Sequence, residues 1–469
     1  MKYRSGEKSM NINKMKSFVI IILVIAAVYQ TGLLWLEDTA SHNFFYTIFG
    51  LESQKEFTAE GNTLLLPSKF VIGSGNKKYT LAYASDIEKE AVLSEGNNLL
   101  QEVLTQGTAD TTIKSVNWDS ILENKCLLLQ YHFFVPVEEY FENYNKKLLI
   151  PALESFNCIA IVPSKTNNST TNIYFINTAL EQSCNITIEK SRFSADLYTM
   201  LEQKENHLTY VSTKQSGFNL FCDSVFVPQW KEESFPYRSV IEINPFMKDG
   251  SINRYFLENS VDSFFKNLES DWNRVDETGT FIFSDENVVV RYYPKGILEY
   301  YSYGTYDTDA VTNIAIGYQI CKNFMNNDTS LKTEVYLSGI EMNRNEMIYY
   351  FDYTVDNYPI LLSEAVQNDF EISHAIEISV RGNSVRKYKR YAHNFRAVDV
   401  KDKQISVEFL EALDQAIEQY QINHKESDIK EVEDMYLGYF VEPDFVVTMK
   451  WITELYDELY IGKTVKDKT

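Results

Sequence analysis

The most apolar stretch of the chain is Ser17–Leu36, which reads SFVIIILVIAAVYQTGLLWL. Roughly 20 helical residues span a hydrocarbon layer of about 30 Å, so this stretch predicts a transmembrane helix. Glu37 and Asp38 follow it, whereas the residues before it are mostly basic: Lys2, Arg4, Lys8, Lys14 and Lys16, opposed by Glu7. Because basic flanks stay in the cytoplasm, we predict a cytoplasmic N-terminus over residues 1–16 and an extracytoplasmic remainder.

A cleaved signal peptide with the apolar core Phe18–Val28 is the alternative reading of the same stretch. The residues after that core include Tyr29 and Gln30, where a signal peptidase requires small side chains. No cysteine precedes Cys126, which excludes a lipoprotein signal. We therefore predict an uncleaved signal-anchor that holds the protein in the cell membrane with a single pass.

After the anchor, short runs with alternating apolar positions are interleaved with runs of helical period, which predicts an α+β fold of mostly antiparallel sheet with flanking helices. We predict three extracytoplasmic domains: an N-terminal α/β domain over residues 45–205, a central α+β domain over 206–308 and a C-terminal α+β domain over 309–469. The near-continuous apolar run Cys126–Val135 is expected at the centre of a sheet. Turn residues such as Pro294-Lys295-Gly296 separate the short strands of the central domain.

The elements that these patterns predict are as follows. Strands are expected at Asn62–Phe70, Tyr79–Tyr83, Cys126–Val135, Asn157–Val162, Asn172–Ile176, Val240–Ile243, Thr280–Phe283, Val288–Tyr292, Ile297–Tyr303, Thr333–Leu337, Met347–Val355, Ile376–Val380, Val385–Tyr391, Met435–Val441 and Val446–Trp451. Helices are expected from Asp86 onward and at Pro136–Phe141, Ser194–Lys204, Ser251–Asn267, Asp309–Phe324 and Val407–Gln419. The first of these helices begins with a capping box formed by Ser85 and Glu88.

The net charge narrows the kinds of molecule that the protein could bind. The net charge of −22 leaves no basic surface to neutralise phosphates, so nucleic acid is excluded as a partner.

The five cysteines are odd in number and none has C-x-x-C spacing, which favours free buried thiols over a disulfide framework. A pairing of Cys184 with Cys222 stays open.

Motifs that would indicate catalysis are absent or misplaced. The six histidines lack H-x-x-x-H spacing and no G-x-S-x-G elbow occurs. Two S-x-x-K matches, Ser74–Lys77 and Ser384–Lys387, fall on predicted hairpin turns, and the S-D-N and K-T-G elements of penicillin-binding enzymes are missing. We therefore predict no catalytic, metal-binding or cofactor-binding residues, and a protein that is not an enzyme.

Polar and small residues inside the predicted anchor are the more informative feature. Gln30 and Thr31 would lie within the membrane, and Ala27, Thr31 and Gly32 would let a second helix approach closely. Together with the interfacial Trp35, these residues form a candidate helix–helix interaction site. The alternative is that Gln30 and Thr31 lie at the outer headgroups, where polarity costs little.

Several segments along the whole chain resemble one known family, beginning with the outer end of the predicted anchor, YQTGLLWL (Tyr29–Leu36). The end of the predicted helix reads VDSFFKN (Val261–Asn267), with Phe264, Phe265, Lys266 and Asn267 as its family-like motif. A meander from Thr280 to Tyr300 follows, then Asp356–Ile360, and then a hairpin that carries Arg381-Gly382-Asn383. In this order the segments resemble YycH, the anchored regulator of the sensor histidine kinase YycG (WalK). The last two regions also resemble its companion YycI.

The resemblance implies a non-enzymatic regulator of a cell-wall two-component system. Its anchor would pack against the transmembrane helices of the kinase and against a YycI-like companion protein, and a homodimer stays open. Two alternatives are an anchored extracytoplasmic enzyme that acts on the cell wall and a passive scaffold module.

Overall fold

The computed structural model describes most of the chain beyond residue 64. The described residues are 65–84, 91–110, 112–141, 153–201, 209–229, 235–265, 273–303, 313–343, 346–406, 409–424, 429, 431–444, 446–456, 458–464 and 466–467. The predicted anchor at 17–36, with Ala27, Gln30, Thr31, Gly32 and Trp35, lies outside the described residues, as does the capping box of Ser85 and Glu88. Within these described ranges, no helix combines the length and the apolar character needed to cross a bilayer.

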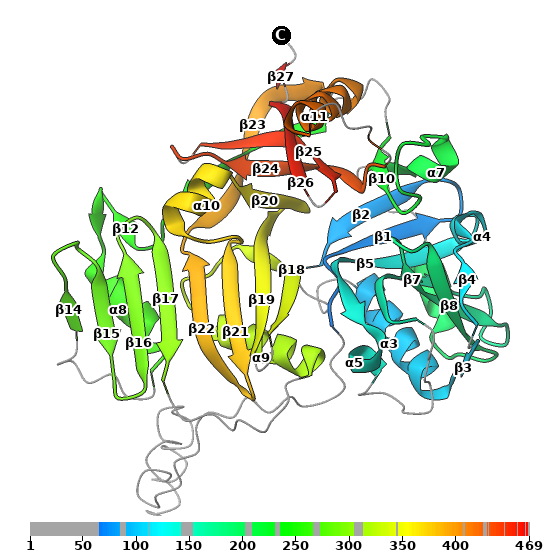
Figure 1. Cartoon of the computed structure of the whole chain (residues 1–469), viewed down its shortest axis with the longest axis horizontal. Helices are drawn as coiled ribbons and strands as arrows, with labels where there is room; N and C mark the ends of the chain where they lie inside the picture. The colour runs from blue at the N-terminus through cyan, green and yellow to red at the C-terminus, as the bar shows by residue number, and fades with distance from the viewer. Residues whose placement is uncertain are drawn as a thin grey trace, which may run out of the picture. The chain divides into compact units, whose positions relative to one another are not determined.

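An antiparallel sheet of ten strands, here called the first sheet, holds the N-terminal part of the described chain (Figure 1). Its order is β10-β9-β2-β1-β5-β6-β7-β8-β3, and β4 pairs with β8. The strands are β1 (Lys69–Ser74), β2 (Tyr79–Tyr83), β3 (Thr108–Ala109), β4 (Lys114–Ser115), β5 (Lys125–Pro136), β6 (Ser155–Val162), β7 (Thr171–Asn177), β8 (Gln182–Ile188), β9 (Tyr210–Ser212) and β10 (Phe226–Pro228). The apolar run around Cys126 forms the central strand β5, as its pattern predicts.

Both faces of the first sheet are buried, because successive side chains of a strand point to opposite faces. Leu127 and Leu129 of β5 join the core beneath helix α3 (Ala91–Gln106), where Leu127 contacts Gly96. Leu128 joins a second core that contains Trp118 of α4 (Trp118–Leu122). The shorter helices α5 (Val137–Phe141), α6 (Ser194–Met200) and α7 (Thr213–Ser216) complete this part of the chain.

A sheet of twelve strands, here called the second sheet, follows the order β14-β15-β16-β17-β22-β21-β19-β20-β24-β25-β26, with β18 on β19. All its pairings are antiparallel except the parallel pair β20 and β24. The strands are β14 (Asn273–Val275), β15 (Phe281–Ser284), β16 (Val288–Tyr293), β17 (Ile297–Ser302), β18 (Glu334–Asn343), β19 (Glu346–Val355), β20 (Tyr358–Leu362), β21 (Ile376–Arg381), β22 (Ser384–Tyr391), β24 (Asp434–Val441), β25 (Val447–Leu455) and β26 (Glu458–Thr464).

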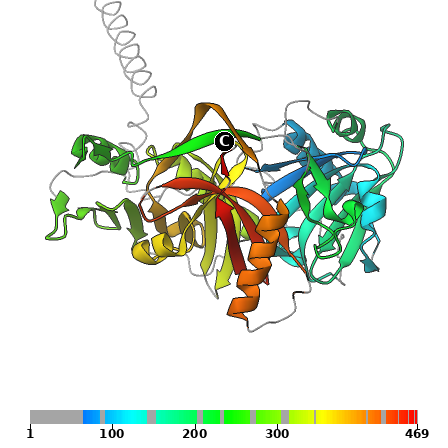
Figure 2. The same ribbon diagram turned by 90° about the horizontal axis from the view of Figure 1, so that it is seen from above.

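Two small sheets and four helices accompany the second sheet. The strands β11 (Phe235–Ile243), β23 (Asn394–Ser406) and β27 (Lys466–Asp467) form one small sheet, and β12 (Met247–Lys248) pairs with β13 (Ser251–Ile252). Figure 2 shows β11 in green beside the long strand β23 in brown. The helices are α8 (Arg254–Asp262), α9 (Ile314–Asn327), α10 (Glu364–Phe370) and α11 (Phe409–Asn423). Helices α8 and α9 both lie behind the second sheet in the view of Figure 1.

The α+β fold with antiparallel sheets is confirmed. The predicted strand Asn62–Phe70 has the wrong bounds, because β1 covers Lys69–Ser74 and residues 65–68 are not part of a strand. One predicted helix also needs correction. The predicted helix Ser251–Asn267 begins at Arg254 instead, because Ser251 and Ile252 pair with β12. Asn253 then caps the helix by accepting a hydrogen bond from the backbone N–H of Phe256. The patterns missed several elements, among them α4, α10, β8, β20, β23 and β26, of which β23 has polar residues in most of its second half. The division into three domains stays a prediction.

Candidate functional site

The described part of the family-like motif lies in the core. Phe264 follows helix α8, and its ring stacks on Phe324 of α9 at 5.4 Å between centroids. The same ring lies 5.8 Å from Tyr300 of β17 and 6.1 Å from Tyr388 of β22. Phe265 is 9% exposed, whereas Lys266 and Asn267 lie outside the described residues. The two phenylalanines therefore join α8 to the second sheet and do not form a surface site.

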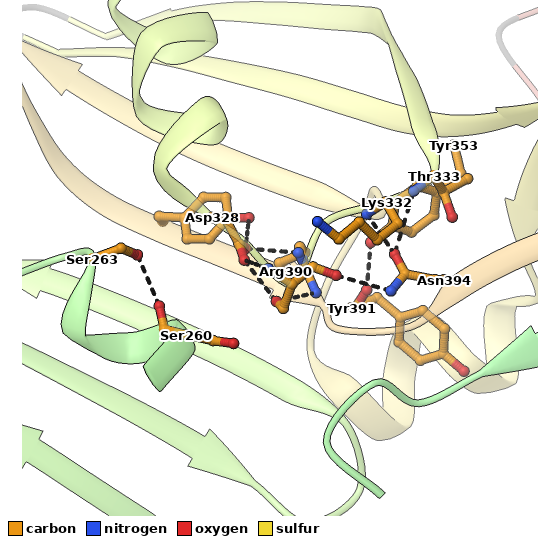
Figure 3. Close-up of polar contacts among 11 residues, drawn as sticks. Ser260, Ser263, Asp328, Lys332, Thr333, Tyr353, Arg390, Tyr391 and Asn394 are labelled. Atoms are coloured by element: carbon orange, nitrogen blue, oxygen red, sulfur yellow. Dashed lines mark hydrogen bonds and ion pairs between the residues drawn. The ribbon is translucent and has the colours of Figure 1, made fainter. Parts of the chain in front are cut away.

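The buried ion pair of Arg390 with Asp328, drawn in Figure 3, is joined to this aromatic cluster by Tyr388. The Nη1 atom of Arg390 lies 2.6 Å from Oδ2 of Asp328, and both side chains are 0% exposed. The hydroxyl of Tyr388 donates to the same carboxylate oxygen at 2.8 Å, and Nη2 of Arg390 donates to Ser330 at 3.0 Å. Burial opposes the charged guanidinium, but the carboxylate of Asp328 raises the pKa of Arg390 above its usual value. The guanidinium of Arg390 therefore stays charged at every physiological pH.

The network continues from Arg390 along the loop between α9 and β18. Asn394 donates to the carbonyl of Ser330 at 2.8 Å and accepts from the backbone N–H of Lys332 at 2.9 Å. The hydroxyl of Tyr353 donates to the carbonyl of Tyr391 at 2.6 Å. Figure 3 shows these side chains converging on one loop from strands that are distant in sequence. Because Arg390 and Asp328 are buried, the network positions the loop and is not accessible to a substrate.

A second buried acid contacts β22 and β23 from the small sheet. The hydroxyl of Tyr391 donates to Oε1 of Glu242 at 2.5 Å, and Nδ1 of His393 lies 3.6 Å from the same oxygen. Burial raises the pKa of Glu242 to about 7, although the bond from Tyr391 opposes this rise. Burial and then Arg390 lower the pKa of His393 to about 3. This group holds β11 on the second sheet and contains a carboxyl that titrates near neutral pH.

The two serines of the S-x-x-K matches lie on hairpin turns, as predicted. Ser74 ends β1, and Gly75 follows it with φ +76°. The hydroxyl of Ser74 donates to Asn76 at 2.5 Å and to the carbonyl of Lys78 at 3.2 Å, and neither acceptor is a general base. Ser384 begins β22 after Gly382, whose φ is +56°. Neither environment activates a nucleophile.

Metal and thiol chemistry find little support in the described residues. In those ranges, no group of three or more His, Cys, Asp or Glu side chains is arranged to hold a metal ion. All five cysteines are free thiols, and Cys126, Cys158, Cys184 and Cys321 are buried. Burial raises the pKa of Cys184 to about 11 and that of Cys126 to about 12, so these thiols stay protonated and unreactive.

A candidate interaction surface lies on the face of the second sheet opposite α8 and α9, here called the outer face. Strand register places its side chains in two rows across the sheet. One row has alternating charge and runs through Arg291, Glu299, Lys389, Glu377 and Tyr350. The other row runs through Val289, Tyr301, Lys387, Ser379 and Ile348. Most of these side chains are partly exposed, so the outer face has solvent access that the opposite face lacks.

Polar contacts hold the side chains of the outer face in place without a bound partner. Tyr293 donates to Glu299 at 2.9 Å, and the ammonium of Lys389 lies 3.4 Å from the same carboxylate. Arg291 lies over the ring of Tyr301 at 5.8 Å. Burial, and then the charge of Glu299, raise the pKa of Tyr301 to about 12, so its hydroxyl is neutral. Tyrosine and arginine held in place on a sheet are typical of protein–protein interfaces.

Sequence reasoning did not find the outer face, although its signal is present. In VVVRYY (Val288–Tyr293) and ILEYYS (Ile297–Ser302), alternate positions carry Arg291, Tyr293, Glu299 and Tyr301. A strand with one solvent-exposed face shows such a pattern. What the pattern lacks is the register, which aligns these strands with Lys387 and Glu377 from a region some 80 residues further along.

Comparisons with known proteins give two structures that are similar to parts of this chain. Neither protein-family models nor curated proteins show a match to the chain. The crystal structure of YycH from Bacillus subtilis is similar over 86% of this chain and 98% of its own, at 13% identity and a TM-score of 0.44. An uncharacterised protein from Eubacterium rectale is similar over 52% of this chain and 90% of its own, at 12% identity and a TM-score of 0.32. The likeness to YycI stays a prediction.

Proposed function

We propose that this protein is a membrane-anchored regulator of a two-component sensor histidine kinase and not an enzyme. The order of the sequence motifs supports this proposal, because FFKN, the meander and the Arg381 hairpin follow one another as in the YycH family. One structural observation carries it further. These segments, dispersed over residues 261–391, pack into one body around Phe264, and that body presents the outer face.

The outer face is the surface that we assign to a protein partner. Its two rows combine tyrosine, arginine and alternating charges that are already ordered by mutual contacts. Pre-ordered side chains lose little conformational entropy on association, which favours binding by a sheet face of this kind. Because the charges alternate in sign, a protein of matching pattern is favoured over a uniformly charged polymer.

Signal transfer would pass through the anchor. Gln30, Thr31 and Gly32 would meet a transmembrane helix of the kinase or of a YycI-like companion, and binding outside would bias the kinase between two states. A regulator of this kind needs both contacts. A passive scaffold, in contrast, would tolerate replacement of the anchor by an unrelated transmembrane helix.

Site-specific photo-crosslinking in native membranes tests both contacts. A crosslinking residue at Gln30 should capture a kinase helix, and one at Tyr301 should capture an extracytoplasmic protein. The control position is Leu180, an exposed apolar residue in the turn between β7 and β8 (62% exposed), which should give no specific product. Gln30→Leu should change kinase autophosphorylation. If Gln30 captures no kinase helix and Gln30→Leu leaves the kinase output unchanged, the proposal is wrong.

A further inference from the structure

The two large sheets meet at a buried ion pair. Lys69 of β1, in the first sheet, binds the carboxylate of Asp434 of β24, in the second sheet, across 365 residues of sequence. Lys69 is 6% exposed and Asp434 is 8% exposed. Both sheets belong to one unit of the chain, residues 57–469, in which β5 lies against β18 and β10 against β24. We call the contact around Lys69 and Asp434 the joint.

A second carboxylate, that of Glu454, lies in the joint and is not paired with any lysine that the structure describes. Glu454 of β25 stands directly opposite Asp434 in the antiparallel ladder. Its side chain is partly buried and accepts a hydrogen bond from Tyr436 at 2.8 Å. The titratable groups that face it are Lys69, Tyr83, Tyr336, Glu433, Asp434 and Tyr436. Among them Lys69 is the cation, and Asp434 already neutralises it.

The joint also contains buried polar atoms that lack hydrogen-bond partners. Within the described residues, the hydroxyl of Tyr83 and Nε2 of His132 have none. Both residues belong to the first sheet, and both rings pack on Tyr336 of the second sheet. The ring centroids lie 4.7 Å apart for Tyr83 and 6.0 Å apart for His132. Unpartnered buried polar atoms weaken a contact, because water would satisfy them if the sheets separated. These unpartnered atoms therefore lower the free-energy cost of separating the two sheets.

Other charges near the joint do not compensate for Glu454. Burial, and then the charge of Lys69, lower the pKa of His132 to about 4, so this ring is neutral at physiological pH. His374 lies 2.8 Å from Asp352 and is matched with that carboxylate. Glu433 is exposed to solvent, so the buried ions of the joint balance when Glu454 is protonated. With Glu454 ionised, one negative charge is left without a counter-ion at a contact between two sheets.

We propose that the joint is a proton-operated latch, closed when Glu454 is protonated and loosened when Glu454 loses its proton. The physical reason is desolvation, because the closed joint removes water from Glu454 whereas separation of the sheets restores it. Burial, and then the neighbouring Asp434, raise the pKa of Glu454 to about 7, which places the change in the neutral range. This inference goes beyond the proposed function and does not depend on it.

Hydrogen exchange of the full-length chain, purified in detergent, tests the latch. Exchange of β1 and β24 is measured at pH 6 and pH 8 after correction for intrinsic rates. Wild-type protection of both strands should fall about tenfold between the two values, because opening becomes easier. Glu454→Gln keeps an acceptor for Tyr436 and carries no charge, so its protection should fall much less than that of wild type between the two values.

Two comparisons make the result decisive. Glu458→Gln removes an exposed carboxylate of the adjacent strand β26 and should behave as wild type. Lys69→Met leaves Asp434 without its partner and should lower protection at both pH values. The latch is excluded if wild-type protection does not change between pH 6 and pH 8. It is equally excluded if Glu454→Gln loses protection as strongly as wild type does.

Discussion

At the scale of single residues, the second sheet depends on an ion pair that is buried away from solvent. Arg390 and Asp328 are both fully buried, and each of them also binds neighbouring hydroxyl groups. Removing one partner of such a pair leaves the other charge unpaired in a low-dielectric core. A surface pair such as Arg254 with Glu258, in which the arginine is 59% exposed, lacks this property.

Arg390→Ala should therefore destabilise the protein by about 3–5 kcal/mol, because Asp328 is left buried and unpaired. Arg254→Ala, the matched control, should change the free energy of unfolding by about 1 kcal/mol or less. The double variant Arg390→Met with Asp328→Leu should lose less stability than Arg390→Ala alone. Urea denaturation measures all three, and equal losses for Arg390→Ala and Arg254→Ala would contradict the assignment of a buried pair.

Glu242 gives the protein a pH-dependent stability. Its pKa of about 7 in the folded chain lies above the ordinary 4.5, so the folded state binds the additional proton. The stabilisation is complete below pH 4.5 and is lost as the pH rises through 7, by up to roughly 3 kcal/mol. Glu242→Gln keeps an acceptor for Tyr391 and should remove this part of the decline. Thermal unfolding between pH 5 and pH 8 measures it, and identical slopes for variant and wild type would count against it.

At the scale of elements, turns decide whether adjacent strands can pack as they do. Gly296 links β16 to β17 with φ +109°, and a Cβ atom there would overlap the imidazole ring of His393. The turn thus needs glycine twice, for its backbone conformation and for the buried ring beside it. The sequence pattern places a turn at Pro294-Lys295-Gly296, but the contact with His393, almost a hundred residues later, is visible only in the fold.

Gly296→Ala should destabilise the chain by about 2–4 kcal/mol, through backbone strain and overpacking together. Gly217→Ala is the control, because Gly217 has φ +76° but its surroundings leave 4 Å of open space around the position that a Cβ atom would take. Strain alone should limit its loss to about 1 kcal/mol. Chemical denaturation of both variants separates the two effects, and a loss at Gly296 no larger than that at Gly217 would show that His393 can move aside.

At the scale of the whole molecule, the second sheet joins segments that the sequence pattern assigns to different domains. Strand β17 pairs along its length with β22, so the meander of residues 273–302 continues into a sheet built by residues up to 464. Phe264 of the same region stacks on α9. Each of these contacts crosses the predicted boundary at residue 308.

A fragment of residues 206–308 should accordingly fail to fold by itself. It would expose the edge of β17 and the apolar side chains that α9 covers. A fragment that begins at residue 206 and continues to residue 469 keeps β22 and α9 and is the comparison. Circular dichroism and dispersed amide resonances distinguish the two, and a folded 206–308 fragment would support the boundary at 308.

The local pattern of side chains accounts for most strands and helices, since apolar periodicity and turn residues act over a few positions. It also places the two S-x-x-K serines on turns, and it puts Phe264 and Phe265 beside a helix end. It could not provide the outer face, the pair of Arg390 with Asp328, or the joint of Lys69, Asp434 and Glu454. Each of these depends on strand register and on contacts across 60 to 365 residues, and neither leaves a periodic signal in the chain.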